Sequence, residues 1–281
     1  MVRYAPRLIT IPVAALCLSS CGGPERKIEE KLAANVLFFA NFDDRSRFEA
    51  FTKKKGTVAA METSSPPRHE FTGGKEDGFV SFANGATYLS YQAKGNFPYN
   101  AGNSWSGGVS FWLSVDPNND FQEKFPEPFS IGKKWDDAVI FVDFDKSRKD
   151  RPPSALRFGC YPDKTQKVGE ELVRQWTIRY DRLNWKSDQW HHVVVTWSNI
   201  NSGNSDAEYA LFVDGEEIGR KKNIRRDITW NMDELAIRLN NYAYSGKIDE
   251  IAIFNTMLDP ADVIYLYKPK RPLKVLLKKD R

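Results

Sequence analysis

Cysteine is scarce in this chain of 281 residues, and a disulfide framework is therefore excluded. Of the three cysteines, Cys17 and Cys21 lie together near the N-terminus and Cys160 stands alone. A single distant thiol without an adjacent base is typical of a small buried residue, so we interpret Cys160 as structural. The hydrophobic core has to stabilise the fold without cross-links.

An excess of one charge, a long hydrophobic run and an internal repeat are also missing. Lysine and arginine total 41 against 37 acidic residues, a net charge of +4 that argues against nucleic acid as a partner. The longest apolar run, 8–18, is interrupted by Thr10 and Pro12 and is too short to span a bilayer. What remains is a chain that is 41% hydrophobic and 13% aromatic, enough for one large core.

The first 21 residues have the pattern of an export signal. Arg3 and Arg7 precede the apolar run, and small residues follow it. Residues 18–21 (LSSC) resemble the lipobox of bacterial lipoproteins, in which the leader is cleaved before a cysteine that is then acylated. The resemblance implies lipidation at Cys21 and a membrane-anchored protein of the bacterial cell envelope. Gly22, where a retention signal would have aspartate, favours the outer membrane if the cell is Gram-negative.

Short strands separated by turn residues dominate the chain after residue 35. The pair Asp214-Gly215 between two apolar runs predicts a type I′ hairpin. A helical period appears only over 259–267, and no alternation of strands with helices suggests a parallel sheet. The fold class is therefore all-β, an antiparallel two-sheet sandwich or jelly roll. The expected strands are 36–42, 78–82, 109–115, 138–144, 176–180, 191–197, 208–213, 235–239 and 247–254, with long connections at 116–137 and 146–154.

Three segments together resemble the laminin-G-like, concanavalin A-like jelly-roll superfamily. They are 108–113 (GVSFWL), 189–197 (QWHHVVVTW) with the hairpin that follows it, and 245–254 (SGKIDEIAIF). The similarity implies one concanavalin A-like domain over 36–267, ending in the helical turn 258–263. It leaves 1–20 as signal peptide, 21–35 as a lipidated tether rich in Gly, Pro and charge, and 268–281 as a basic tail.

The basic tail allows two interpretations. Its seven lysines and arginines face a single acid, Asp280. Such a tail can rest on anionic lipid. Alternatively it is a solvated segment, or a short last strand at 273–277 with its charges in water.

The sequence lacks the carboxylate pattern of known catalytic sandwiches. Laminarinase-like enzymes of this fold carry Glu-x-Asp-x-x-Glu on one strand face. The nearest stretch, 247–252 (KIDEIA), has Lys247 at the first position and no carboxylate three residues after Asp249. We therefore expect no hydrolase or lyase activity.

Metal binding is expected at one place only. His191 and His192 are adjacent on a strand and point to opposite faces, and His69 is remote, so zinc is disfavoured. Relatives of the superfamily often hold one structural calcium ion between the first and last strands, and Asp43 and Asp249 match those positions. Carboxylate oxygens suit this cation.

Exposed aromatic residues are the expected ligand contacts, because sugar-binding sandwiches stack sugar rings on them. The resemblance implies a non-catalytic domain that binds carbohydrate or an envelope protein. Two alternatives remain: a catalytic sandwich, marked by paired carboxylates or a Tyr-His-Arg cluster in a groove, and a structural protein–protein interaction module, marked by a flat apolar patch. The aromatic residues that lie beside polar or turn residues are Trp135, Tyr161, Trp185, Trp230, Tyr242 and Tyr244.

Overall fold

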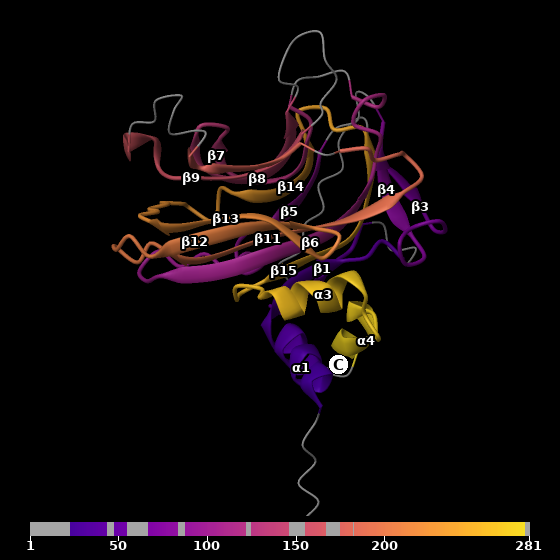
Figure 1. Cartoon of the computed structure of the whole chain (residues 1–281), viewed down its shortest axis with the longest axis horizontal. Coiled ribbons are helices and arrows are strands. Elements are labelled where there is room, and N and C mark those ends of the chain that lie inside the picture. Colours follow the sequence, from indigo (N-terminus) through magenta and orange to yellow (C-terminus); the bar gives the residue numbers. More distant parts are fainter. Residues whose placement is uncertain are drawn as a thin grey trace, which may run out of the picture.

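Two antiparallel sheets stacked face to face form the body of the protein (Figure 1). The all-β sandwich that the strand pattern predicts is confirmed. This computed structural model describes residues 23–43, 48–54, 67–83, 88–121, 125–145, 155–166, 175–181 and 183–278. Cys21 and the connection 146–154 lie outside the described residues.

The larger sheet has nine strands in the order β13-β12-β11-β6-β15-β1-β2, with β4 beside β15 and β3 beside β4. Its strands are β1 (Val36–Ala40), β2 (Phe51–Thr52), β3 (Arg68–Glu70), β4 (Phe79–Phe82), β6 (Trp105–Ser114), β11 (Trp190–Ile200), β12 (Ala207–Val213), β13 (Glu216–Ile224) and β15 (Gly246–Phe254). The smaller sheet has six strands in the order β10-β9-β8-β7-β14-β5. They are β5 (Leu89–Gln92), β7 (Glu127–Lys134), β8 (Asp137–Asp145), β9 (Ala155–Tyr161), β10 (Thr177–Tyr180) and β14 (Ala236–Asn241), and a short 3-10 helix, η1 (Lys164–Gln166), follows β9.

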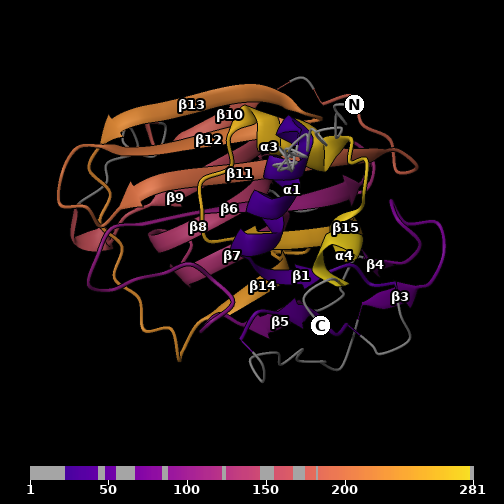
Figure 2. The same ribbon diagram turned by 90° about the horizontal axis from the view of Figure 1, so that it is seen from below.

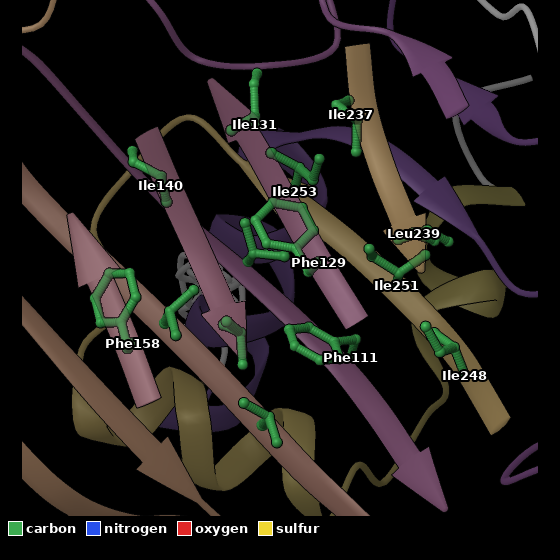
Figure 3. Packing of buried hydrophobic residues seen from close by; sticks show 14 of the residues in the cluster. Phe111, Phe129, Ile131, Ile140, Phe158, Ile237, Leu239, Ile248, Ile251 and Ile253 are labelled. Atoms are coloured by element: carbon green, nitrogen blue, oxygen red, sulfur yellow. The ribbon is translucent and has the colours of Figure 1, made fainter. Parts of the chain in front are cut away.

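The main core lies between the two sheets, because alternate residues of each strand point inward. Phe111 of β6 and Phe129 of β7 meet there, with ring centroids 6.1 Å apart (Figure 3). The Asp214-Gly215 hairpin is confirmed: Val213 pairs with Glu216 and both turn residues have positive φ, 52° and 86°. Register in this hairpin is therefore set by two residues that tolerate the left-handed conformation.

Three helices cover the outer face of the nine-stranded sheet (Figures 1 and 2). They are α1 (Pro24–Asn35), α3 (Pro260–Tyr267) and α4 (Leu273–Leu277). The helical turn expected near residue 259 is confirmed in α3, where Asp259 and Asp262 form a capping box. Among the described residues, no helix is long and apolar enough to cross a membrane.

Two of these helices correct the sequence interpretation. The segment predicted as a tether is helical from Pro24 onward and packs through Leu32. Glu29 on this helix binds the guanidinium of Arg271 and accepts a hydrogen bond of 2.6 Å from the Tyr265 hydroxyl. The segment predicted as a solvated tail or strand contains α4, whose three leucines are buried. Both segments are helical because tertiary contacts pair their charges and bury their few apolar residues, which local sequence does not show.

The connection predicted over 116–137 is also wrong in part, since β7 occupies Glu127–Lys134. Pro126 and Pro128 suggested a loop. Pro126 lies just before the strand, and the strand accommodates Pro128 at its second residue. This correction matters because β7 and its hairpin with β8 carry the site described next.

Candidate ligand-binding site

A recess of about 420 Å³ lies on the outer face of the six-stranded sheet. This sheet is on the opposite side of the sandwich from the helices (Figure 1). A second hollow of about 210 Å³ shares Glu127, Trp135 and Tyr242 with it. The two hollows are therefore contiguous, and we refer to them together as the aromatic groove. The larger one is lined by Phe125, Glu127, Trp135, Phe141, Asp143, Arg157, Tyr161 and Tyr242.

The floor of the groove is formed by side chains that point outward from β8 and β9, because residues alternate between the two faces of a strand. Along β8, Ile140, Val142 and Phe144 enter the core, so Phe141 and Asp143 point outward. Tyr161 of β9 lies beside Phe141, edge to face, with ring centroids 5.1 Å apart. Tyr161 is only 5% exposed, so it contributes to the floor of the groove.

The walls of the groove are exposed aromatic side chains. Lys134 pairs with Asp137, which leaves Trp135 in the two-residue turn of the β7–β8 hairpin, 66% exposed. Tyr242 follows β14 with a φ of 54° and is 51% exposed, and Phe125 is 43% exposed. These aromatic rings are exposed to solvent because the turn and strand ends that carry them point them away from the core. Exposed rings of this size favour a ligand that has an apolar face.

Polar groups complete the groove. Arg157 donates two hydrogen bonds to Asp143, with Nε 2.8 Å from Oδ1, and its guanidinium lies 5.1 Å from the centre of the Phe125 ring. Burial raises the pKa of Asp143, and the positive charge of Arg157 opposes that shift. The paired guanidinium is thereby fixed in orientation against an aromatic ring.

Glu127 is the second carboxylate of the groove. Among the described residues, no lysine or arginine forms a hydrogen bond with it. It is 5% exposed and accepts a hydrogen bond of 2.8 Å from the Asn241 side chain. Burial raises its pKa to about 7. The groove thus combines exposed rings with a buried acceptor and a fixed guanidinium, the mixture of apolar surface and a few placed polar groups that is typical of small-molecule sites.

The structure brings together half of the aromatic residues predicted as ligand contacts. Trp135, Tyr161 and Tyr242 line the groove. The expectation of exposure is wrong for four of the six: Tyr161 is 5% exposed in the floor of the groove, and Trp185, Trp230 and Tyr244 are 2%, 5% and 0% exposed in the main core.

Trp230 and Tyr244 can be buried because their polar ends find hydrogen-bond partners in the core. The Trp230 indole donates 2.7 Å to the carbonyl of Ala138, and the Tyr244 hydroxyl donates 3.1 Å to that of Lys247. In the larger hollow, sequence reasoning missed Phe125, Glu127, Phe141, Asp143 and Arg157. Only Phe141 and Asp143 had a signal in the sequence, since they alternate with the apolar core residues of β8.

Comparison with known proteins agrees with the two-sheet architecture. The profile of the Concanavalin A-like lectin/glucanases superfamily matches residues 86–264, more than half of the chain. The chain belongs to this superfamily. No curated protein is significantly similar to the whole sequence.

Similar solved structures include several binding domains. They include those of Paraclostridial Mosquitocidal Protein 1 (TM-score 0.55, 14% identity, 84% of this chain and 52% of that one) and botulinum neurotoxin serotype G (0.56, 13%, 83% and 50%). A third is the botulinum neurotoxin serotype D ligand binding domain in complex with N-acetylneuraminic acid (0.58, 12%, 86% and 53%). This chain spans about half the length of each, and identities this low show the shared fold alone.

The carboxylates predicted to hold calcium are close to one another, but their contacts do not fit that ion. Asp249 is fully buried and accepts backbone N–H groups from Lys75 (2.8 Å), Glu76 (3.2 Å) and Glu250 (2.7 Å). Asp43 accepts the N–H of Gly78 at 3.1 Å and the side-chain amide of Asn41. Hydrogen-bond donors thus point at the oxygens that calcium would need. Within the described residues, no three His, Cys, Asp or Glu side chains are grouped to hold a metal.

The two adjacent histidines point to opposite faces, as predicted. His191 stacks on Trp185 at 4.3 Å and lies 2.7 Å from Asp214, whereas His192 is buried on the other face, 2.8 Å from the Ser110 hydroxyl. Burial lowers the pKa of His192 to about 3, so the ring is neutral. The pair lies outside the aromatic groove.

Proposed function

We propose that this protein is a non-catalytic carbohydrate-binding protein of the bacterial cell envelope, and that the aromatic groove is its ligand site. The observation that carries the proposal is the pair of exposed rings, Trp135 and Tyr242, standing over a recess that also holds Glu127 and Arg157. Sugar rings bind through CH groups stacked on aromatic faces and through hydroxyls bonded to carboxylate and guanidinium groups. Support from the fold is that the serotype D domain was solved with a sialic acid.

The position of the helices supports presentation of the groove away from a membrane. Helix α1 begins at Pro24, three residues after the proposed lipid site Cys21. Three residues reach about 10 Å at most. A lipid at Cys21 would hold the helical side of the sandwich near the bilayer, and the groove lies on the opposite side (Figure 1).

Binding of the chain from residue 22 onward to a glycan array tests the proposal, followed by affinity measurement for the best ligand. Trp135→Ala and Tyr242→Ala should each weaken affinity by about 1 to 3 kcal/mol, roughly 5- to 150-fold, without changing the thermal midpoint. Phe71→Ala is the matched control, because Phe71 is 47% exposed and lies outside the groove. Failure of the wild-type domain to bind any glycan, or binding that survives both groove substitutions, would contradict the proposal.

A catalytic sandwich is the second candidate, favoured by one observation. Glu127 and Asp143 line the same recess, and a carboxyl group with a pKa of about 7 suits a general acid. Against it, Asp143 is 4% exposed and bound by Arg157 at both oxygens. New reducing ends or unsaturated products from a polysaccharide panel, lost in Glu127→Gln, would establish an enzyme and overturn the binding proposal.

A further inference from the structure

A lysine from the C-terminal segment binds Asp43, one of the two carboxylates predicted to hold calcium. Lys274 of α4 has its Nζ 3.0 Å from Asp43 Oδ2 and 2.9 Å from Asp77 Oδ2. Asp43 belongs to the segment that follows β1, and Asp77 belongs to the loop between β3 and β4. One ammonium group therefore connects the C-terminal helix to two segments that are distant in sequence.

The local backbone places a further carboxylate, that of Glu250, on the same side of the sheet as this lysine. A β-bulge interrupts the register of β15 against β6 between Asp249 and Ala252, and Glu250 has a φ of 51°. Because of the bulge, Glu250 faces the helical side of the sheet, as Asp249 and Ala252 do. Its Oε1 atom is buried and has no hydrogen-bond partner among the described residues. The positive charge of Lys274 opposes the rise in the pKa of Glu250 that burial causes.

The ion pair is held in place by packing. Leu273 and Leu276, on either side of Lys274 in α4, are 6% and 4% exposed in the cluster formed with Leu32 and Phe39. The side chain of Lys274 is 21% exposed and that of Asp43 is 15% exposed. Contacts at this depth are screened less by water than the exposed pair Lys270–Glu25 on the same segment.

We propose that Lys274 is the resident cation of this end of the sandwich, and that its ammonium group takes the place of a bound divalent metal. Two consequences follow. The native fold does not depend on calcium, and the C-terminal segment is a structural part of the domain. Removal of the ammonium group leaves the carboxylates of Asp43 and Asp77 without their shared cation, and the described residues offer no group of three side chains to bind a metal in its place.

Thermal unfolding of the full chain tests this proposal. Wild type, Lys274→Met and the control Lys270→Met are melted in chelator, in millimolar calcium chloride, and in sodium chloride of equal ionic strength. We expect the wild-type midpoint to be the same in all three. Lys274→Met should melt a few degrees lower than wild type in all three solutions, because the ion pairs with Asp43 and Asp77 are lost and no bound metal replaces them. Lys270→Met should behave as wild type.

Two outcomes would overturn the proposal: a wild-type midpoint raised specifically by calcium, or no loss of thermal midpoint in Lys274→Met. If Lys274→Met fails to fold, Asp77→Asn gives a milder test, since Asp77 is 71% exposed. This variant should melt lower than wild type in chelator and show no specific response to calcium, since the ammonium group still fills the position. A midpoint equal to that of wild type, or one raised by calcium, would refute the proposal.

Discussion

Replacement of Glu127 by glutamine should stabilise the protein increasingly as the pH rises from about 4.5 to about 7, and should leave it unchanged at lower pH. Glu127 is 5% exposed and accepts a hydrogen bond from Asn241. Burial raises its pKa from 4.5 to about 7. Glutamine has nearly the same shape, and its carbonyl can accept the same hydrogen bond.

The magnitude follows from the two pKa values. Below pH 4.5 the carboxyl group is neutral in both folded and unfolded chains, and folding is not penalised. Between pH 4.5 and about 7 the unfolded chain releases the proton and the folded chain retains it, so stability falls as pH rises. Above pH 7 the full penalty is present, and a shift of this size corresponds to about 3 kcal/mol.

Urea denaturation of wild type and Glu127→Gln between pH 4 and pH 8 measures this effect. The difference in unfolding free energy should rise from near zero to about 3 kcal/mol over that range. Taking the difference cancels other titrating groups, including Asp249, whose pKa burial raises to about 8. Glu234→Gln is the control for loss of one negative charge, since Glu234 is exposed. A difference that stays constant with pH would refute the reasoning. If Glu127 binds ligand hydroxyls, the stabilised variant should also bind glycan more weakly.

Other predictions separate buried from exposed groups. Trp230→Ala should cost about 3 to 5 kcal/mol in unfolding free energy, whereas Trp135→Ala should change it by less than about 0.5 kcal/mol; similar losses would contradict the assigned burial. Cys160 should react with a thiol reagent only after denaturation, because it is fully buried and burial raises its pKa to about 11; rapid labelling of native protein would contradict this. Cys21→Ala should release the protein from the membrane fraction of cells, and unchanged partition would exclude the lipid anchor.

The sequence by itself determined the sandwich. Alternation along runs such as 191–197 indicates a strand with one buried face, and Asp214-Gly215 specifies its turn by local sterics alone. These features depend on neighbours in the chain, so they can be read without the fold. The capped turn that begins at Asp259 was predictable for the same reason.

Only the tertiary structure decided which aromatic residues reach solvent. Trp135 and Trp230 both lie beside polar residues in sequence, but Trp135 occupies a hairpin turn and Trp230 donates its N–H into the core. Their exposure depends on how strands from distant parts of the chain stack. No local pattern encodes that stacking.

Long-range pairing likewise created both charged sites. Glu127 lies beside Asn241 because β7 pairs with β14, which is more than a hundred residues away. Lys274 lies beside Asp43 because α4, too short to be stable alone, is held by its buried leucines. Sequence shows these groups only as scattered charges, since the free energy that places each of them comes from contacts with residues remote in the chain.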